Sequence, residues 1–292
     1  MTDNGTERVD EITPAVTASP ILPELWLRVA TGLVLGIAAA ALAWAGVLPF
    51  SVLALAVALV LSWEWAHVVR GRSDDLPLAI QGIAVLGAIG LAAFGFAALG
   101  VAVLLIGTII VLALEFGSRP VLSAFGVLYA GLPAVALIWL RADAPMGFLA
   151  VLFIMLVVAA TDTFAFIAGR TLGGPRLAPS LSPNKTWSGF LGGVSAAGLT
   201  AAAFAYFAGA PILALALIGL GVGLVAQAGD LAESSLKRSF HLKDASGLLP
   251  GHGGFMDRVD GLVPVAVLVA LAALFVDPRA PATALLSGFS MM

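Results

Sequence analysis

Long apolar runs separated by short polar segments dominate the chain from residue 26 to residue 277. Most runs approach the roughly 20 residues that an α-helix needs to cross the hydrocarbon core of a bilayer. They predict an all-α polytopic integral membrane protein with about nine transmembrane helices. The expected helices lie at about 26–46, 48–69, 77–96, 98–115, 121–140, 147–168, 188–208, 211–229 and 261–277.

The distribution of polar positions divides the chain into three parts. Residues 1–24 are polar and acidic and lack the features of a secretory signal peptide, so we expect a disordered cytosolic tail. Residues 25–141 form the predicted N-terminal transmembrane helices, rich in the small residues that favour close helix packing. Residues 142–292 contain the two stretches that most interrupt the apolar sequence, and form the predicted catalytic transmembrane region.

Basic residues gather in the loops that follow even-numbered helices. Because Lys and Arg accumulate in cytosolic loops, these loops are predicted to be cytosolic. We therefore expect an integral plasma (inner) membrane protein with a cytosolic amino terminus and active site and an external carboxyl terminus. The basic residues concerned are Arg70, Arg72, Arg119, Arg170, Arg176, Lys185, Lys237, Arg238 and Lys243.

Composition supports this location and restricts the metal chemistry. Hydrophobic residues make up 61% of the chain and charged residues 11%, with a mean hydropathy of +1.07, whereas soluble domains carry about 25% charged residues. The net charge of -3 says little about partners. The absence of cysteine excludes disulfides and thiolate metal sites, and the three histidines are too scattered for a zinc motif. Any bound metal should therefore be a hard cation with oxygen ligands.

Two carboxylates stand out in the first five predicted helices. Glu64 lies between Trp63 and Trp65, and Glu115 ends the fourth apolar run. Both are near predicted cytosolic ends, so we favour interfacial carboxylates accompanied by a tryptophan belt. The alternative is that they line the cavity of an active site.

The first polar stretch starts inside the sixth predicted helix. Asp162 lies about two turns inside this helix, where an unpaired carboxylate costs roughly 2.5 to 3.5 kcal/mol, so we expect a cation or a basic partner. Arg170, Arg176 and Lys185 follow in a loop rich in Gly and Pro, which suits a lipid headgroup phosphate. An ordinary positive-inside loop is the alternative. The run at 182–186 weighs against it, because it places a lysine and two hydroxyls where a helix begins.

The second polar stretch extends the eighth predicted helix and leads into the ninth. Asp230, Glu233 and Lys237 share one helix face if the eighth helix continues past Gly229. A Pro-Gly-His-Gly-Gly turn then leads into the ninth helix, whose first turns are predicted to carry two acids pointing the same way, Asp257 and Asp260. Carboxylates for a divalent cation, and amides and basic groups for phosphates, are what nucleotidyl transfer requires. A solvated charged loop would leave these acids at helix ends unexplained.

The second stretch resembles the signature of the phosphatidate cytidylyltransferases, also called CDP-diacylglycerol synthases. The first stretch is similar to the companion segment of this family, with one departure at Ser188, where Glu is expected after Trp. Any role of that acid is lost or taken by another residue. The resemblance is specific over about 160–262, with the signature at about 227–262. Its fixed elements are Ser234, Lys237, Arg238, Lys243, Asp244, Ser246, Leu249, Pro250, His252, Gly253, Gly254, Asp257, Arg258 and Asp260.

The resemblance implies a reaction in phospholipid biosynthesis. CTP and phosphatidate give CDP-diacylglycerol and pyrophosphate by Mg2+-dependent attack of the lipid phosphate on the α-phosphorus. A phosphate monoester is largely dianionic near pH 7, so this nucleophile needs no general base. The acyl chains are expected to stay in the bilayer. The partners implied are CTP, phosphatidate, membrane lipids and a second copy in a homodimer, without nucleic acid; whether a second, monovalent or divalent, cation binds is left open.

The resemblance also implies roles for individual residues. Asp230 and Asp257 are the expected metal ligands, with Asp260 and Asp162 as further members. The triphosphate and pyrophosphate are expected to contact Lys237, Arg238, Lys243 and Arg258 and the turn of His252, Gly253 and Gly254. The expected catalytic group is Asp230, Asp257, Lys237, Arg238 and Asp260, and the expected phosphatidate-binding group is Arg170, Arg176 and Lys185.

Some alternatives stay open at this level. Asp244 is as well explained by pairing with Lys243 or Arg238 as by a role in the site. For His252 we favour support of its loop by hydrogen bonding over a role as a base. Buried charges among helices also mark transport paths, although no inverted repeat is visible and the charges cluster at one face. A phosphotransferase acting on a lipid carrier is a further alternative, but the motif of the CDP-alcohol transferases is missing.

Overall fold

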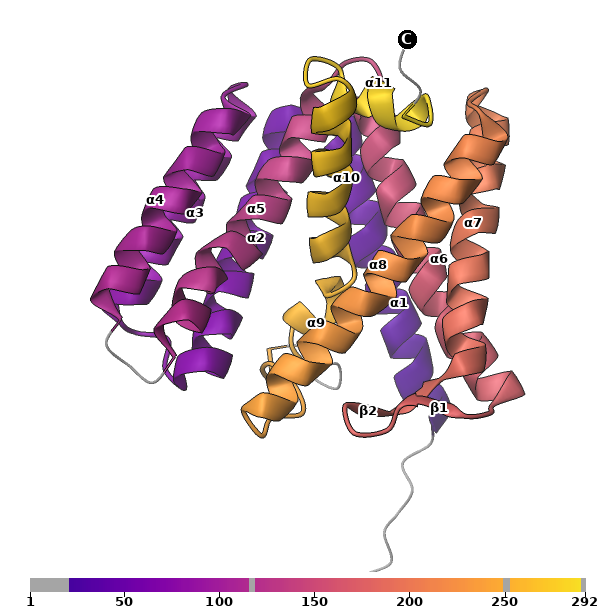
Figure 1. The fold of residues 1–292 in the computed structure, drawn as a ribbon, viewed down its shortest axis with the longest axis horizontal. Helices are drawn as coiled ribbons and strands as arrows, with labels where there is room; N and C mark the ends of the chain where they lie inside the picture. The colour runs from indigo at the N-terminus through magenta and orange to yellow at the C-terminus, as the bar shows by residue number, and fades with distance from the viewer. Residues whose placement is uncertain (1–20, 116–118, 249–252, 290–292) are drawn as a thin grey trace, which may run out of the picture.

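A computed structural model describes residues 21–115, 119–248 and 253–289, and within them long helices run side by side as a bundle (Figure 1). The predicted tail at 1–24 lies outside the described residues up to residue 20, and a helix begins at Ile21. The long helices are α1 (Ile21–Ala45), α2 (Val47–Arg70), α3 (Leu76–Ala93), α4 (Ala97–Leu114), α5 (Pro120–Ala142), α6 (Gly147–Leu172), α7 (Trp187–Ala208), α8 (Ile212–Ser239) and α10 (Leu262–Val276).

Each of the nine predicted apolar runs coincides with one of these helices; boundaries differ by a few residues, except that α8 continues to Ser239, beyond the predicted end at 229. Seven helices, α2 to α8, are long and apolar enough to cross a membrane. Among the described residues, α10 and the segment Val34–Ala45 of α1 are shorter apolar helices. The chain is therefore a helical polytopic membrane protein.

Local signals explain where several helices begin and end. Gly71 ends α2 in the left-handed conformation, with φ of 69°. Asp75 then caps α3 by accepting a hydrogen bond from the Leu78 amide at 3.0 Å, and Arg70 donates to the Asp75 carboxylate at 2.7 Å. Thr186 caps α7 in the same way, accepting from the Gly189 amide at 3.1 Å. The predicted start of a helix at the run 182–186 is thus confirmed.

Helices α6, α7 and α8 pack with their backbones unusually close, because glycines lie where they cross. A Cβ at Gly193 of α7 would lie 2.8 Å from the Thr161 carbonyl of α6. A Cβ at Gly219 of α8 would lie 2.7 Å from the Ala197 carbonyl of α7. This close packing brings the polar residues of α6 and α8 toward one another.

Four short elements are additional to the helices that the sequence predicts. Strands β1 (Arg176–Ala178) and β2 (Ser182–Thr186) form an antiparallel hairpin between α6 and α7. A four-residue helix, α9 (Met256–Val259), precedes α10, and α11 (Pro281–Leu286) follows it. Asp257 and Asp260 were expected in the first turns of the ninth helix; instead Asp257 lies in α9 and Asp260 in the break before α10.

Candidate active site

A polar pocket of about 650 Å³ opens among α6, the β1–β2 hairpin, α7, α8, α9 and the break before α10. Figure 1 places the hairpin, α9 and the C-terminal end of α8 at the same end of the bundle. The pocket volume falls in the range of small-molecule sites. Its lining includes Asp162, Phe166, Arg170, Asn184, Lys185, Thr186, Gln227, Asp230, Asp257, Arg258 and Asp260.

Three carboxylates form the most acidic part of the site. Asp230, Glu233 and Asp260 each have an oxygen within 4.8 Å of the others. Helix α8 continues to Ser239, so Asp230 and Glu233 lie on one face of it, as predicted. Glu233 is only 5% exposed, and its buried Oε1 has no hydrogen-bond partner. Burial, followed by the charges of Asp230 and Asp162, raises the pKa of Asp260 to about 9.

This cluster fits a hard divalent cation. All of its donors are carboxylate oxygens, which Mg2+ prefers, and a buried oxygen without a partner is free to take a ligand. Burial and the charges of the neighbouring acids disfavour the ionised form of Asp260, and its raised pKa reflects that. Glu233 was not among the predicted ligands, although its spacing from Asp230 was noted.

The buried side chain of Lys237 bridges Glu233 of the cluster and Asp257 of α9. Its side chain is largely buried, and its Nζ lies 2.8 Å from Glu233 Oε2 and hydrogen-bonds Asp257. Asp257 also accepts from the Gly254 amide at 2.7 Å and from the Ala245 amide at 3.3 Å. Burial alone would raise the pKa of Asp257, but the hydrogen bonds from Lys237 and Gly254 hold this pKa below its usual value.

The hairpin delivers a second lysine to the cluster. Lys185 of β2 places its Nζ 2.6 Å from Asp230 Oδ2. Asp162 of α6 lines the same pocket, so the two predicted polar stretches meet here. Ser188, which departs from the family pattern, donates to the Gly173 carbonyl and ties the first turn of α7 to the end of α6.

The other predicted basic residues separate into two groups. Arg170 and Arg258 line the pocket, and the Arg170 guanidinium lies 5.9 Å from the Phe166 ring centroid. Arg176, Arg238 and Lys243 are exposed and lie outside the pocket lining. Arg238 donates to the Leu242 carbonyl at 3.0 Å.

The glycine turn is described only from Gly253 onward. Gly253 has a positive φ of 78°, and a Cβ there would lie 3.0 Å from Asp257 Oδ2, so the turn and the acid are closely fitted. Gly254 is buried beside them. His252 lies outside the described residues, so its predicted role stays a prediction.

Glu64 is the residue of this region that sequence analysis interpreted wrongly. It is fully buried rather than interfacial. Its Oε1 accepts from the Phe255 amide at 2.7 Å and from Ser246 Oγ, and its Oε2 accepts from the Met256 amide at 2.5 Å. A carboxylate from α2 therefore holds the start of α9 and with it the segment that carries Asp257. The high cost of burying a carboxylate in an apolar helix was the available signal.

Comparisons with known proteins agree with the signature. The sequence pattern of the Cytidylyltransferase family matches residues 26–276. The phosphatidate cytidylyltransferase of Brucella suis is 40% identical over 274 residues, which cover 89% of this chain and 97% of that protein. The phosphatidate cytidylyltransferase of Bacillus subtilis is 42% identical over 132 residues, covering 44% of this chain and 49% of that protein.

Proposed function

The chain belongs to the cytidylyltransferase family, and on this premise we propose that it is a phosphatidate cytidylyltransferase, a CTP-using nucleotidyltransferase of phospholipid biosynthesis. It joins CTP and phosphatidate into CDP-diacylglycerol and releases pyrophosphate. The observation that carries the proposal is the polar pocket, in which Asp230, Arg258 and Asp260 of the signature meet Asp162 and Lys185 of the companion segment.

For this reaction the protein must offset the negative charges of the two substrates and align the lipid phosphate with the α-phosphorus of CTP. An oxygen of the lipid phosphate forms a bond to the α-phosphorus of CTP, and the bond from that phosphorus to the oxygen of the β-phosphate breaks. Both reactants are anions, so basic side chains must offset their repulsion and hold them in line. Arg170, Lys185 and Arg258 are the basic groups in the pocket wall. No side chain has to remove a proton, because the lipid phosphate is already deprotonated near pH 7.

The metal ligands are proposed from the carboxylate cluster. Asp230, Glu233 and Asp260 would hold Mg2+, and Asp162 and Asp257 remain candidate ligands nearby. When bound, the ion neutralises charge on the phosphate oxygens. Lys237 acts on this site through Glu233 and Asp257, since its Nζ is held between the two carboxylates. A second cation stays a prediction.

The membrane arrangement is proposed in the same way. α1 and α10 would cross the membrane together with α2 to α8, giving nine spans with the pocket end cytosolic. Support comes from the basic residues Arg70, Arg119, Arg170 and Lys237, which follow or end even-numbered helices. Residues 142–292 would then be the catalytic region. Glu64 of the N-terminal helices contributes to this region, because it accepts a hydrogen bond from the Phe255 amide at the start of α9. A homodimer remains an expectation.

Pyrophosphate release by the detergent-purified chain tests the function directly. The assay contains CTP, phosphatidate and Mg2+, with each omitted in turn, and includes Asp230→Asn. We expect release to require all three and to fall about a hundredfold or more in the variant, because a cluster oxygen is lost. Asp74→Asn is the matched control, since Asp74 is exposed between α2 and α3. Folded wild-type protein that releases no pyrophosphate would refute the proposal and favour transport.

A further inference from the structure

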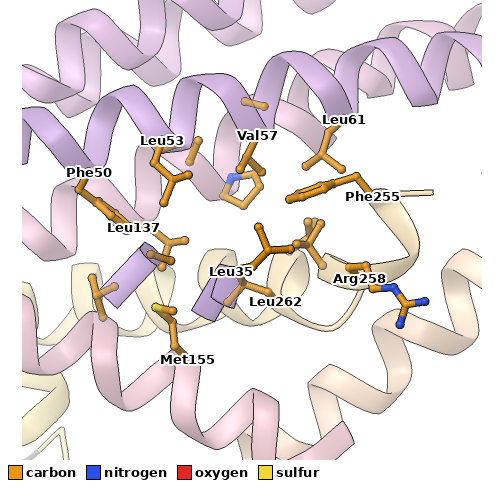
Figure 2. A pocket seen from close by; sticks show the side chains of 18 of the residues that line it. Leu35, Phe50, Leu53, Val57, Leu61, Leu137, Met155, Phe255, Arg258 and Leu262 are labelled. Atoms are coloured by element: carbon orange, nitrogen blue, oxygen red, sulfur yellow. The ribbon is translucent and has the colours of Figure 1, made fainter. Parts of the chain in front are cut away.

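An apolar groove of about 340 Å³ adjoins the polar pocket (Figure 2). It is bounded by α1, α2, α5, α6 and the segment from α9 into α10. Arg258 is the one charged residue among the described residues that line it. Apolar side chains that line it include Leu35, Phe50, Leu53, Leu137, Met155 and Leu262.

The groove is elongated and ends at the catalytic pocket. Its lining positions on α2 run from Phe50 to Leu61, which corresponds to about 16 Å of helix. Figure 2 shows Phe50 at one end of the row and Arg258, beside Phe255, at the other. Arg258 also lines the polar pocket, so one cationic side chain borders both spaces.

Small residues keep the groove open along its length. A Cβ built at Gly32 or Gly36 of α1 would meet nothing within 4 Å. Ala54 and Ala58 of α2 and Ala134 of α5 line it as well. An apolar space left empty loses dispersion contacts along its whole wall, so an apolar occupant is strongly favoured there.

We propose that this groove holds one acyl chain of phosphatidate, with the methyl end toward Phe50 and the lipid phosphate beside Arg258. The assignment rests on the proposed function, which supplies a substrate with an anionic head and long apolar chains. Another lipid of the bilayer would gain the same apolar contacts, but the phosphate of phosphatidate is a terminal monoester, so it can face the polar pocket without a further headgroup in the way. The chain would run along the row of lining side chains from Arg258 to Phe50 of α2 (Figure 2).

Filling the groove at Gly36 tests this assignment. Gly36→Leu puts a side chain into open space, and Gly90→Leu on α3 is the matched control, since a Cβ at Gly90 also meets nothing within 4 Å and Gly90 lines neither pocket. The full-length purified proteins are compared by kcat/KM for dioleoyl-phosphatidate and dihexanoyl-phosphatidate. We expect Gly36→Leu to lower the value for the long-chain lipid about tenfold or more, because methylene contacts are displaced.

The short-chain lipid separates the possible outcomes. A six-carbon chain occupies only the end beside Arg258, so its kcat/KM should stay within about twofold in Gly36→Leu, and the control should keep both values. An unchanged ratio of long-chain to short-chain kcat/KM in Gly36→Leu would overturn the acyl-chain assignment. Wild-type protein that converts neither lipid would instead overturn the proposed function, and the assignment with it. If Gly36→Leu does not fold, Leu53→Trp fills the groove from α2 instead, and the same ratio of long-chain to short-chain kcat/KM is measured.

Discussion

At the scale of single residues, Glu64 shows how one buried carboxylate can organise a loop that is distant in the sequence. Its oxygens accept hydrogen bonds from the amides of Phe255 and Met256 and from Ser246 Oγ. Glu64→Gln preserves the shape but can turn an amide N–H toward these donors. We expect a loss of about 1–3 kcal/mol in stability and a fall in kcat greater than any rise in KM for CTP.

Unfolding in detergent and steady-state kinetics check this expectation. Glu115→Gln is the control, because Glu115 accepts from Ser123 at 3.4 Å at the end of α4, away from either pocket. A Glu64→Gln protein as stable and as active as wild type would show that the three hydrogen bonds do not position α9.

Asp75 gives a pH-dependent prediction. Burial would raise the pKa of Asp75, but the hydrogen bond and charge of Arg70 and the Leu78 amide hold it below its usual value. A lowered folded-state pKa contributes stability above the unfolded pKa of about 3.9, and this contribution is lost as pH falls through the folded-state pKa. Asp75→Asn keeps the cap but removes the charge, so it should cost about 1 kcal/mol at pH 7. Thermal unfolding should show that cost shrinking below about pH 4; a pH-independent difference would contradict it.

The sequence pattern predicted which residues belong to the site, but it predicted few of the contacts between them. Asp230, Asp257 and Asp260 reach the same pocket, as the signature implies. The partners of these acids were not predicted. Asp257 accepts a hydrogen bond from Lys237, and Glu233 lies in one carboxylate cluster with Asp230 and Asp260. The role of Glu64 depends on contacts across more than 180 residues of sequence, which no local pattern encodes.

At the scale of elements, the β1–β2 hairpin places Lys185 in the polar pocket and leaves Arg176 exposed outside it. Lys185 pairs with Asp230 at 2.6 Å, whereas Arg176 is exposed. We expect Lys185→Met to raise KM for phosphatidate about tenfold or more, because a charge-assisted contact to the phosphate is lost. Arg176→Met should have a much smaller effect, although both residues were predicted to bind phosphatidate. Initial rates at varied phosphatidate concentration measure both KM values. An equal rise in KM for the two variants would contradict the assignment of Lys185, but not Arg176, to the phosphate.

Long elements were more predictable than short ones. The apolar runs located the long helices, and the polar stripe of Asp230 and Lys237 anticipated the extension of α8. The hairpin was missed because its strands have three and five residues and lie in a loop rich in Gly and Pro. The break between α9 and α10 was missed because the helical spacing of Asp257 and Asp260 continues across it.

At the scale of the whole molecule, the carboxylate cluster links α8 to the chain just before α10. Asp230 and Glu233 come from α8, and Asp260 from the break. Mg2+ bound only by the folded protein should therefore raise its melting temperature, with a gain of about 2.7 kcal/mol at a hundredfold excess over Kd. Differential scanning fluorimetry with and without a chelator measures this, and Asp260→Asn should remove most of the shift while Asp74→Asn retains it. An identical shift in both variants would place the ion elsewhere.

The overall arrangement was predictable only in part. Apolar run lengths indicate a helical membrane bundle, but the relation between the two halves depends on tertiary contacts such as that of Glu64 with α9. The polar pocket and the apolar groove arise from helices far apart in the sequence, so the signature alone gives neither their shapes nor their shared boundary at Arg258.

Helices α3 and α4 contribute no described residue to either pocket, and they lie at one side of the bundle (Figure 1). Their connection turns at Gly95, which has φ of 90° and open space around its Cβ position. In Figure 1 this turn is at the end of the bundle opposite the hairpin. A small rigid protein fused into this turn would give electron cryomicroscopy an asymmetric landmark for particle alignment while leaving the chemistry undisturbed.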